Sequence, residues 1–314
     1  MARIACVGTG NVGRAWAVVF TRGGHQVALY DQNPEQVSAA LPLIKITLEQ
    51  LASAGLLKDP LSDVIARIRP CKTLVEAVCD ADHVQESVRE DLEIKRSVAR
   101  DIASLAPATT VIASSTSALP GSTFLANITH PERALVAHPV NPPSLIPLVE
   151  LCTTGITSPE VIEKTKLFME SLDMKPVVLN KEIDGFLLNR LQYTLVAEAL
   201  HLVGEGYCSA ADIDRVMTEG LALRWLSIGP FATAHLNATQ GFAGFVAQLG
   251  PMMRKMGSSA KTDYDWPQSL ADQIHNEMAE TFPVNDIAKW QAWRDAQILA
   301  ARKTQAEGKS DHPN

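Results

Sequence analysis

Residues 3–31 read "RIACVGTGNVGRAWAVVFTRGGHQVALYD", and this stretch decides the fold. Its first run is apolar and β-branched and predicts a strand, "RAWAVVFTR" predicts a helix, and "QVALYD" predicts a second strand. Three glycines, Gly8, Gly10 and Gly13, stand between the first strand and the helix. The order of strand, glycine turn, helix and strand is one βαβ unit, which builds a parallel sheet.

The glycine spacing GxGxxG in this context predicts a dinucleotide site. Glycine lets the backbone turn tightly and approach a pyrophosphate, and the N-terminus of the helix supplies N–H groups for that anion. Asp31 ends the second strand, where a carboxylate accepts a hydrogen bond from a ribose 2′-hydroxyl and repels a 2′-phosphate. No arginine follows it, so NAD is expected rather than NADP. The alternative is that Asp31 is a solvated strand-end or N-cap residue before Pro34.

The rest of the chain divides into two parts of different character. Helical patterns at 91–105 and 159–172 alternate with strand patterns, so a mostly parallel sheet is expected. Residues 34–69 are also helical in pattern. From about residue 187 the patterns are helical with few strand signals. We therefore predict a doubly wound α/β domain over 1–183 and an all-helical domain over 184–314. The later strands are expected at 83–87, 110–115, 134–139, 148–153 and 176–180.

Composition narrows the function classes. The chain has 314 residues, 46% of them hydrophobic, and a formal net charge of −7. Its Lys and Arg residues form no cluster, which argues against nucleic acid as a partner, and no apolar run is long enough to span a membrane. The start of the chain does not have the pattern of a signal peptide. Five scattered cysteines without a CxxC pair predict free thiols in the cytoplasm and no metal site.

His138 and Glu150 lie at the two ends of "HPVNPPSLIPLVE", residues 138–150. Among eight histidines, most are expected at the surface, at helix caps or in structural positions. His138 differs because it ends a predicted strand, and ligands bind outside the carboxyl ends of such strands. Glu150 lies in an apolar strand, where a buried carboxylate needs a partner. We expect a general base and its orienting carboxylate, the alternative being a glutamate that faces solvent on an edge strand.

Four motifs resemble the L-3-hydroxyacyl-CoA dehydrogenase superfamily, in the same order and at matching spacing over nearly the whole chain. They are the N-terminal GxGxxG, "SSTSAL" at 114–119, "HPVNPPSLIPLVEL" at 138–151 and "DGFLLNRL" at 184–191. Within the superfamily, "AHPVNPP", "KEIDGFLLNRLQY" and "VMTEGLALRWLSIGP" resemble the lambda-crystallin branch of L-gulonate 3-dehydrogenases. The resemblance implies a Rossmann-type domain followed by a helical domain for the substrate and for dimerisation.

The resemblance also implies roles for single residues. His138 matches the catalytic base, Glu150 its orienting carboxylate, and Ser117 and Asn189 the two residues that contact the reacting oxygen. Without the resemblance, Glu90 and Lys95 would be charges on a solvated helix start. The residues expected to contact NAD are Gly8, Gly10, Asn11, Val12, Gly13, Asp31, Glu90, Lys95 and Asn141.

Two departures from the acyl-CoA branch concern the substrate. Proline and valine follow His138 where that branch has two phenylalanines, which is expected to reshape the substrate entrance. Arg224, in "GLALRWLSIGP", has no counterpart in that branch. An arginine binds a free carboxylate by a bidentate pair, which a thioester does not need. The alternative is a surface arginine on a helix.

The expected function is that of an NAD-dependent dehydrogenase acting on a small 3-hydroxy acid. L-Gulonate, oxidised to 3-dehydro-L-gulonate, is the leading substrate. The alternatives are a 3-hydroxyacyl-CoA dehydrogenase, such as a 3-hydroxybutyryl-CoA enzyme, and a dehydrogenase of another 3-hydroxy acid, such as carnitine. A crystallin-like structural protein without chemistry is the alternative outside enzymes. The apolar helix surface from Leu187 to Val203 predicts a homodimer.

Overall fold

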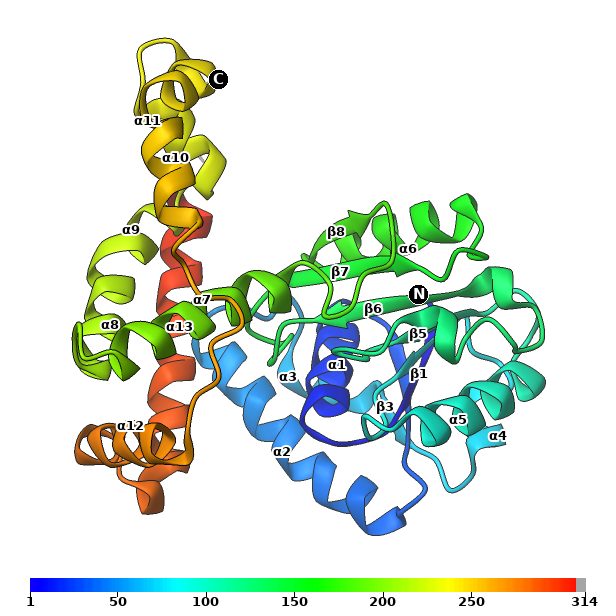
Figure 1. Cartoon of the computed structure of the whole chain (residues 1–314). Coiled ribbons are helices and arrows are strands. Elements are labelled where there is room, and N and C mark those ends of the chain that lie inside the picture. Colours follow the sequence, from blue (N-terminus) through cyan, green and yellow to red (C-terminus); the bar gives the residue numbers. More distant parts are fainter. Residues whose placement is uncertain (309–314) are drawn as a thin grey trace. The chain divides into compact units, whose positions relative to one another are not determined.

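The predicted βαβ unit forms the centre of a sheet. In the computed structural model, which describes residues 1–308, β1 (Arg3–Val7) leads into α1 (Asn11–Arg22) and then β2 (Gln26–Tyr30). Ala5 and Val7 pack on one face of the sheet with side chains of α4 (Leu74–Val78) and α5 (Leu92–Leu105). Helices cover both faces of the sheet (Figure 1), so the strands are buried on both sides as in doubly wound folds.

Eight strands form one sheet in the order β3-β2-β1-β4-β5-β6-β7-β8. All neighbouring strands are parallel except β6 and β7, which are antiparallel. The order reverses between β1 and β4, and in such sheets the ligand binds outside the carboxyl ends of the strands at this reversal. The predicted mostly parallel sheet is confirmed. Its other strands are β3 (Ile68–Pro70), β4 (His83–Glu86), β5 (Val111–Ser114), β6 (Ala134–Pro139), β7 (Leu148–Thr153) and β8 (Lys175–Leu179).

The helix expected over 34–69 is wrong in its second half. Helix α2 (Pro34–Ser53) starts with Pro34 in its first turn and the Asn33 side chain as its cap. It ends before Gly55, whose φ of +73° belongs to the left-handed region that ends helices. A short helix α3 (Leu61–Ala66) and the edge strand β3 follow. The expected helix over 159–172 is present as α6 (Pro159–Ser171).

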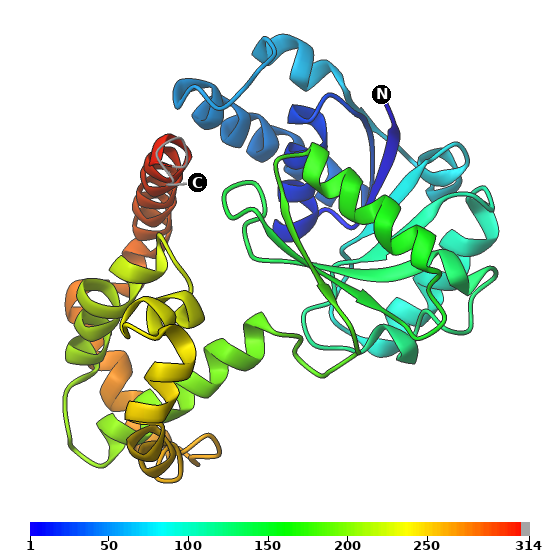
Figure 2. The same ribbon diagram turned by 90° about the horizontal axis from the view of Figure 1, so that it is seen from above.

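The chain divides into two units, Met1–Arg190 and the residues from Leu191 onward. The division falls inside helix α7 (Leu188–Gly204), a few residues after the predicted boundary at 183 and 184. In the second unit all the described elements are helical (Figure 2). After α7 they are α8 (Ala210–Val216), a π-helical turn (Met217–Leu221), α9 (Ala222–Trp225), α10 (Pro230–Leu236), α11 (Gly241–Gly257), α12 (Gln268–Thr281), a 3-10 turn (Val284–Asp286) and α13 (Ile287–Gly308).

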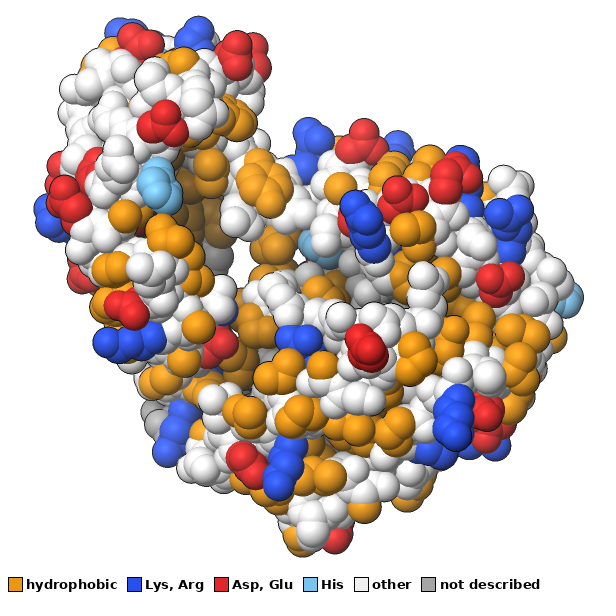
Figure 3. Space-filling model, turned by 90° about the horizontal axis from the view of Figure 1, so that it is seen from below, with side chains coloured by type: hydrophobic (Ala, Val, Ile, Leu, Met, Phe, Trp, Pro, Cys, Tyr) orange, Lys and Arg blue, Asp and Glu red, His pale blue; other side chains and the backbone are white. Residues whose placement is uncertain are grey.

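The second unit has a small core and many exposed apolar side chains. Val203, Ala210 and Leu270 are its buried cluster. On α7, Leu191 is 74% exposed and Tyr193 is 61% exposed. Hydrophobic side chains, orange in Figure 3, are visible at the surface of the molecule. Within residues 1–308, no helix combines the length and the apolarity that crossing a membrane requires.

Candidate active site

The glycine loop after β1 is shaped for close backbone approach. Gly8 has a φ of +96°, and a Cβ there would lie 2.5 Å from the Ser87 carbonyl oxygen at the end of β4. A Cβ on Gly13 would lie 1.9 Å from the Gly8 carbonyl oxygen. A Cβ on Gly10 would meet no atom of the described residues within 4 Å. Gly8 and Gly13 therefore have no room for a side chain, because neighbouring backbone packs directly against them. Gly10 instead leaves open space beside the loop.

The N-terminus of α1 and the end of β2 complete a site that fits a dinucleotide. Gly10 is the N-cap of α1, and within the described residues no side chain caps the first-turn N–H groups, which include those of Asn11 and Val12. These groups suit a pyrophosphate. The Asp31 carboxylate accepts from the backbone N–H of Thr9 at 2.8 Å and of Asn33 at 3.0 Å. Asp31 is thus held at the carboxyl end of β2, where a ribose diol of NAD would bind.

His138 and Glu150 are direct cross-strand partners on β6 and β7. Their side chains are 5% and 2% exposed, and His138 Nδ1 lies 2.8 Å from Glu150 Oε2. An ionised carboxylate only accepts hydrogen bonds, so Nδ1 carries the proton and Nε2 is left as the basic nitrogen. Glu150 does not face solvent on an edge strand, which excludes the alternative considered from the sequence.

The second oxygen of Glu150 binds the start of helix α7. Oε1 accepts from the backbone N–H of Leu187 at 2.8 Å and of Leu188 at 3.0 Å. Burial acts to raise the pKa of the Glu150 carboxyl, but the hydrogen bonds from His138, Leu188 and Leu187 outweigh it and the pKa is lowered. The carboxylate therefore stays ionised at neutral pH, as a partner for an imidazolium must.

Ser117 and Asn189 are brought together by a hydrogen bond. The Asn189 side-chain amide, in the first turn of α7, donates to the Ser117 backbone carbonyl at 2.8 Å. Ser117 is exposed, and within residues 1–308 its hydroxyl makes no hydrogen bond to the protein. Because Leu187 and Leu188 bind Glu150, the same helix start connects the serine loop with the His138 pair. The four residues expected to do chemistry thus belong to one connected arrangement.

Lys95 lies in a buried ion-pair network, so the sequence-based alternative of a solvated charge is wrong for this residue. Its side chain is 1% exposed, and its Nζ lies 3.0 Å from Glu86 and 3.4 Å from Glu90. Glu90 in turn accepts from Thr116 Oγ1 at 2.6 Å and from the backbone N–H groups of Ser117 and Ala118. Burial raises the pKa of Glu90, but these hydrogen bonds and Lys95 lower it overall. The network holds the loop that carries Ser117.

Asn141 and Arg224 are two further predicted site residues, and they lie on other segments of the chain. Asn141 is exposed in the loop after β6. Arg224 lies on α9 of the second unit. Their contacts with NAD and with a substrate carboxylate stay predictions.

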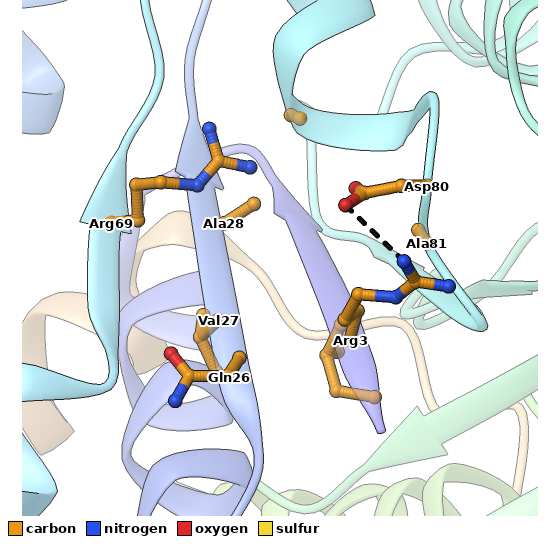
Figure 4. Close-up of a pocket in the computed structure, with 9 residues that line it drawn as sticks. Arg3, Gln26, Val27, Ala28, Arg69, Asp80 and Ala81 are labelled. Carbon is orange, nitrogen blue, oxygen red and sulfur yellow. Dashed lines mark ion pairs between the residues drawn. The ribbon is translucent and has the colours of Figure 1, made fainter. Parts of the chain in front are cut away.

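A separate pocket lies at the opposite, amino-terminal edge of the sheet. Arg3 and Gln26 begin β1 and β2 there, and the Arg3 guanidinium points to the Asp80 carboxylate at 3.6 Å (Figure 4). Arg69 lines the same pocket. None of the predicted site residues does so, and the pocket lies away from the carboxyl strand ends where ligands of such folds bind.

Glu86, Thr116 and Phe186 belong to the site but were not predicted from the sequence. Glu86 is the buried partner of Lys95 and accepts from Ser114 Oγ at 2.5 Å. A carboxylate at the end of a buried strand was a usable signal, because it needs a partner. Thr116 binds Glu90, and the Phe186 ring lies 5.2 Å from the His138 ring. A hydroxyl and an apolar side chain in loops carry no such signal.

Two family models match the chain over consecutive ranges. The 3-hydroxyacyl-CoA dehydrogenase NAD binding domain matches residues 3–183, and the 3-hydroxyacyl-CoA dehydrogenase C-terminal domain matches residues 185–281. The first model covers the glycine loop, the His138 pair and the Lys95 network. NAD is therefore the cofactor that the glycine loop serves.

Relatives and solved structures extend the likeness over almost the full chain. Lambda-crystallin of Oryctolagus cuniculus is 38% identical, with 93% of this chain and 92% of the relative covered. L-Carnitine dehydrogenase of Oceanobacillus iheyensis is 36% identical over 89% of this chain and 88% of the relative. Among solved structures, the 5-formyl-3-hydroxy-2-methylpyridine 4-carboxylic acid 5-dehydrogenase, described as an NAD+-dependent dismutase, has a TM-score of 0.84 at 27% identity. The match covers 98% of this chain and 99% of that chain. The chain belongs to the 3-hydroxyacyl-CoA dehydrogenase family of NAD-dependent dehydrogenases.

Proposed function

We propose that this dehydrogenase oxidises the 3-hydroxyl of a small, free 3-hydroxy acid, with L-gulonate as the leading substrate and 3-dehydro-L-gulonate as the product. The observation that carries the proposal is the buried pair of His138 and Glu150, 2.8 Å apart, near the carboxyl ends of the strands. Oxidation of an alcohol needs a base for the hydroxyl proton, and this pair provides one with a fixed tautomer.

Each residue has a defined task in this reaction. His138 Nε2 takes the hydroxyl proton, and Glu150 stabilises the imidazolium that forms. The Ser117 hydroxyl and the Asn189 amide donate hydrogen bonds to the substrate oxygen as it becomes a carbonyl. Bound NAD supplies the hydride acceptor. Gly10, with open space above it, and the first turn of α1 hold the pyrophosphate of the cofactor.

The proposed role of Ser117 agrees with how its loop is held. Glu90 fixes the loop through three hydrogen bonds, none of them to the Ser117 hydroxyl. The Ser117 hydroxyl is therefore left for substrate while its backbone is immobilised. Asn189 uses one donor on Ser117, and its side-chain amide has a second donor for the reacting oxygen. Such fixed donors stabilise developing charge without reorganising.

The choice of a free acid rests on the likeness to lambda-crystallin and L-carnitine dehydrogenase and on two residues of this sequence. Val140 follows Pro139 beside His138, and Arg224 supplies a guanidinium for a substrate carboxylate. The competing substrate is a 3-hydroxyacyl-CoA, since a 3-hydroxybutyryl-CoA dehydrogenase of Escherichia coli has the same fold with a TM-score of 0.66 and 26% identity, covering 80% of this chain and 52% of that one.

A substrate panel tests the proposal. NADH formation is followed with L-gulonate, L-carnitine, 3-hydroxybutyrate and 3-hydroxybutyryl-CoA at equal concentrations of the protein. We expect turnover of free acids, with the highest kcat/KM for L-gulonate. Turnover of the CoA thioester alone would overturn the free-acid assignment. Absence of turnover with every compound, together with intact NAD binding, would favour the crystallin-like structural role.

We also propose a cytoplasmic homodimer built on the helical unit. The exposed Leu191 and Tyr193 of α7 support it, because monomeric proteins rarely leave such apolar helix surface uncovered. Five free cysteines support a reducing compartment. Light scattering of the purified protein gives the mass in solution, and a mass of one chain would overturn the dimer.

A further inference from the structure

The loop between β8 and α7 places an aromatic ring on the catalytic histidine. Phe186 is fully buried, and its ring centroid lies 5.2 Å from that of His138 with an interplanar angle of 36°. The other members of its buried cluster come from three strands, namely Val136, Cys152 and Leu179. The ring is therefore fixed from behind by β6, β7 and β8 while it covers the imidazole.

The backbone of Phe186 is as unusual as its position. Its φ is +52°, in the left-handed region that non-glycine side chains rarely adopt, and it follows Gly185 with a φ of +71°. The Phe186 N–H closes a turn onto the Ile183 carbonyl at 3.1 Å. The next two residues donate both of their N–H groups to Glu150 Oε1. The strained residue is thus the one that turns the chain so that these amides reach the carboxylate.

One residue therefore acts on both partners of the catalytic pair. We propose that Phe186 is a positioning residue for the pair. Its ring holds the His138 imidazole in place, and its backbone turn directs the Leu187 and Leu188 amides onto Glu150. Residues in sparsely populated backbone regions persist where the surroundings over-determine them, and they gather at active sites. The inference rests on the proposed role of His138 as the base.

The ring also keeps water from the hydrogen bond of the pair. His138 and Glu150 are both buried, and the Phe186 ring lies against the His138 imidazole. In a water-excluded site a charge-assisted hydrogen bond is stronger, and its proton exchanges slowly with solvent. Removal of the ring lets water reach Nδ1 and lets the imidazole rotate. A purely structural side chain in the same cluster would not have this effect.

The experiment measures kcat and the low-field proton resonance of His138 Nδ1–H in histidine-labelled protein, assigned by its loss in His138→Gln. We expect Phe186→Ala to lower kcat by about 100-fold, the loss that follows a misplacement of about 1 Å, and to broaden the resonance beyond detection. The KM for NAD is expected to stay unchanged. Leu179→Ala is the matched control, because it removes an aliphatic side chain of the same cluster and leaves the aromatic ring on His138 in place. It should keep both readouts.

Wild-type kcat and an intact resonance in Phe186→Ala would overturn the inference, and so would equal losses in Leu179→Ala. If Phe186→Ala does not fold, Phe186→Leu decides, because it keeps most of the apolar volume. Phe186→Leu is expected to lower kcat by about tenfold, a value between that of the wild type and the 100-fold loss in Phe186→Ala. It should also weaken the His138 resonance. Wild-type values of both readouts would refute the positioning role of Phe186. If the wild type oxidises none of the panel acids, the proposed function fails, whereas the resonance still tests Phe186.

Discussion

Glu150→Gln is the substitution that probes the proposed catalytic pair of His138 and Glu150 with the least change in shape. The new side chain keeps one oxygen that can accept from Leu187 and Leu188, as Oε1 does at 2.8 and 3.0 Å. Its amide NH2 then faces His138 Nδ1, and two donors cannot share a hydrogen bond. The imidazole therefore adopts the other tautomer, with the proton on Nε2, and loses its ability to accept the proton of the substrate hydroxyl.

The magnitude follows from what is lost. One charge-assisted hydrogen bond to a charged group contributes about 1.5–3 kcal/mol, or a factor of about 10 to 150 in rate at 1.36 kcal/mol per tenfold. The wrong tautomer adds to this loss, and the equivalent change in a Ser-His-Asp triad costs about 10⁴ in kcat. We expect kcat for Glu150→Gln to fall by between about 10² and 10⁴, with the KM for NAD unchanged.

A matched control separates catalysis from helix capping. Glu277, like Glu150, caps a helix that is distant in sequence. Its carboxylate accepts from the N–H groups of Ala210 and Ala211 at the start of α8. Glu277→Gln is the same substitution at a helix start without a histidine, and it should leave kcat within about twofold of the wild type, since no group of the reaction is touched. A kcat for Glu150→Gln within threefold of the wild type would refute the reasoning.

The same variant has a defined pH signature in stability. The pKa of Glu150 is lowered in the folded protein from its ordinary value of 4.5. The ionised carboxylate therefore stabilises the fold in full at pH values above that ordinary pKa. That contribution is lost as pH falls through the lowered value. Urea unfolding should therefore show Glu150→Gln less stable than the wild type at pH 7, with a smaller difference at pH 4. A difference that stays constant with pH would contradict the lowered pKa.

Three further predictions concern the cofactor, the serine loop and the substrate. The methyl group of Gly10→Ala would meet no atom of the described residues within 4 Å, so the variant should fold like the wild type. It should weaken NAD binding by about 1.5–3 kcal/mol in calorimetry, since the methyl group blocks the approach of a phosphate. Unchanged affinity would mean that the pyrophosphate binds elsewhere. Lys95→Met removes the cation that pairs with the buried Glu86 and should destabilise the protein by about 3–5 kcal/mol in urea unfolding. A loss below about 1 kcal/mol would mean that the network is not needed for folding. Arg224→Met should raise the KM for free acids by about 10- to 100-fold without changing the KM for NAD, as expected for the loss of a charged pair, and an equal KM would remove the proposed carboxylate contact.

Much of the first unit could be predicted from its sequence because each element has a local signal. The alternation of apolar strands with helices fixes the sheet, and glycines with defined spacing fix the loop after β1. Strand β3 carries no such signal, because three residues at a sheet edge are too few for any periodicity to show. The end of α2 at Ser53 was not predicted, because apolar residues continue at helical spacing beyond it. The left-handed backbone of Gly55 ends the helix there, and the chain changes direction before α3.

Pairing of site residues was predictable where the residue types have a characteristic chemistry, as histidine and glutamate do. It was less predictable where the position of a residue depends on a partner from another element. His138 and Glu150 lie only 12 positions apart on adjacent strands, so their pairing follows from the strand pattern. Burial of Lys95 depends on Glu86, which lies on a different element, and charges near a helix start give no sign of it. The left-handed backbone of Phe186 depends on its packing against three strands, which no local pattern encodes.

The most direct test of the central claim compares turnover with NAD binding in His138→Ala. The wild type is expected to form NADH from a 3-hydroxy acid, and His138→Ala is expected to lose this activity. Its Kd for NAD, measured by calorimetry, should stay within about threefold, since the proposed role of His138 is that of the base and the residue is not part of the glycine loop. A His138→Ala variant that keeps turnover with the same acid would contradict the assignment of His138 as the base.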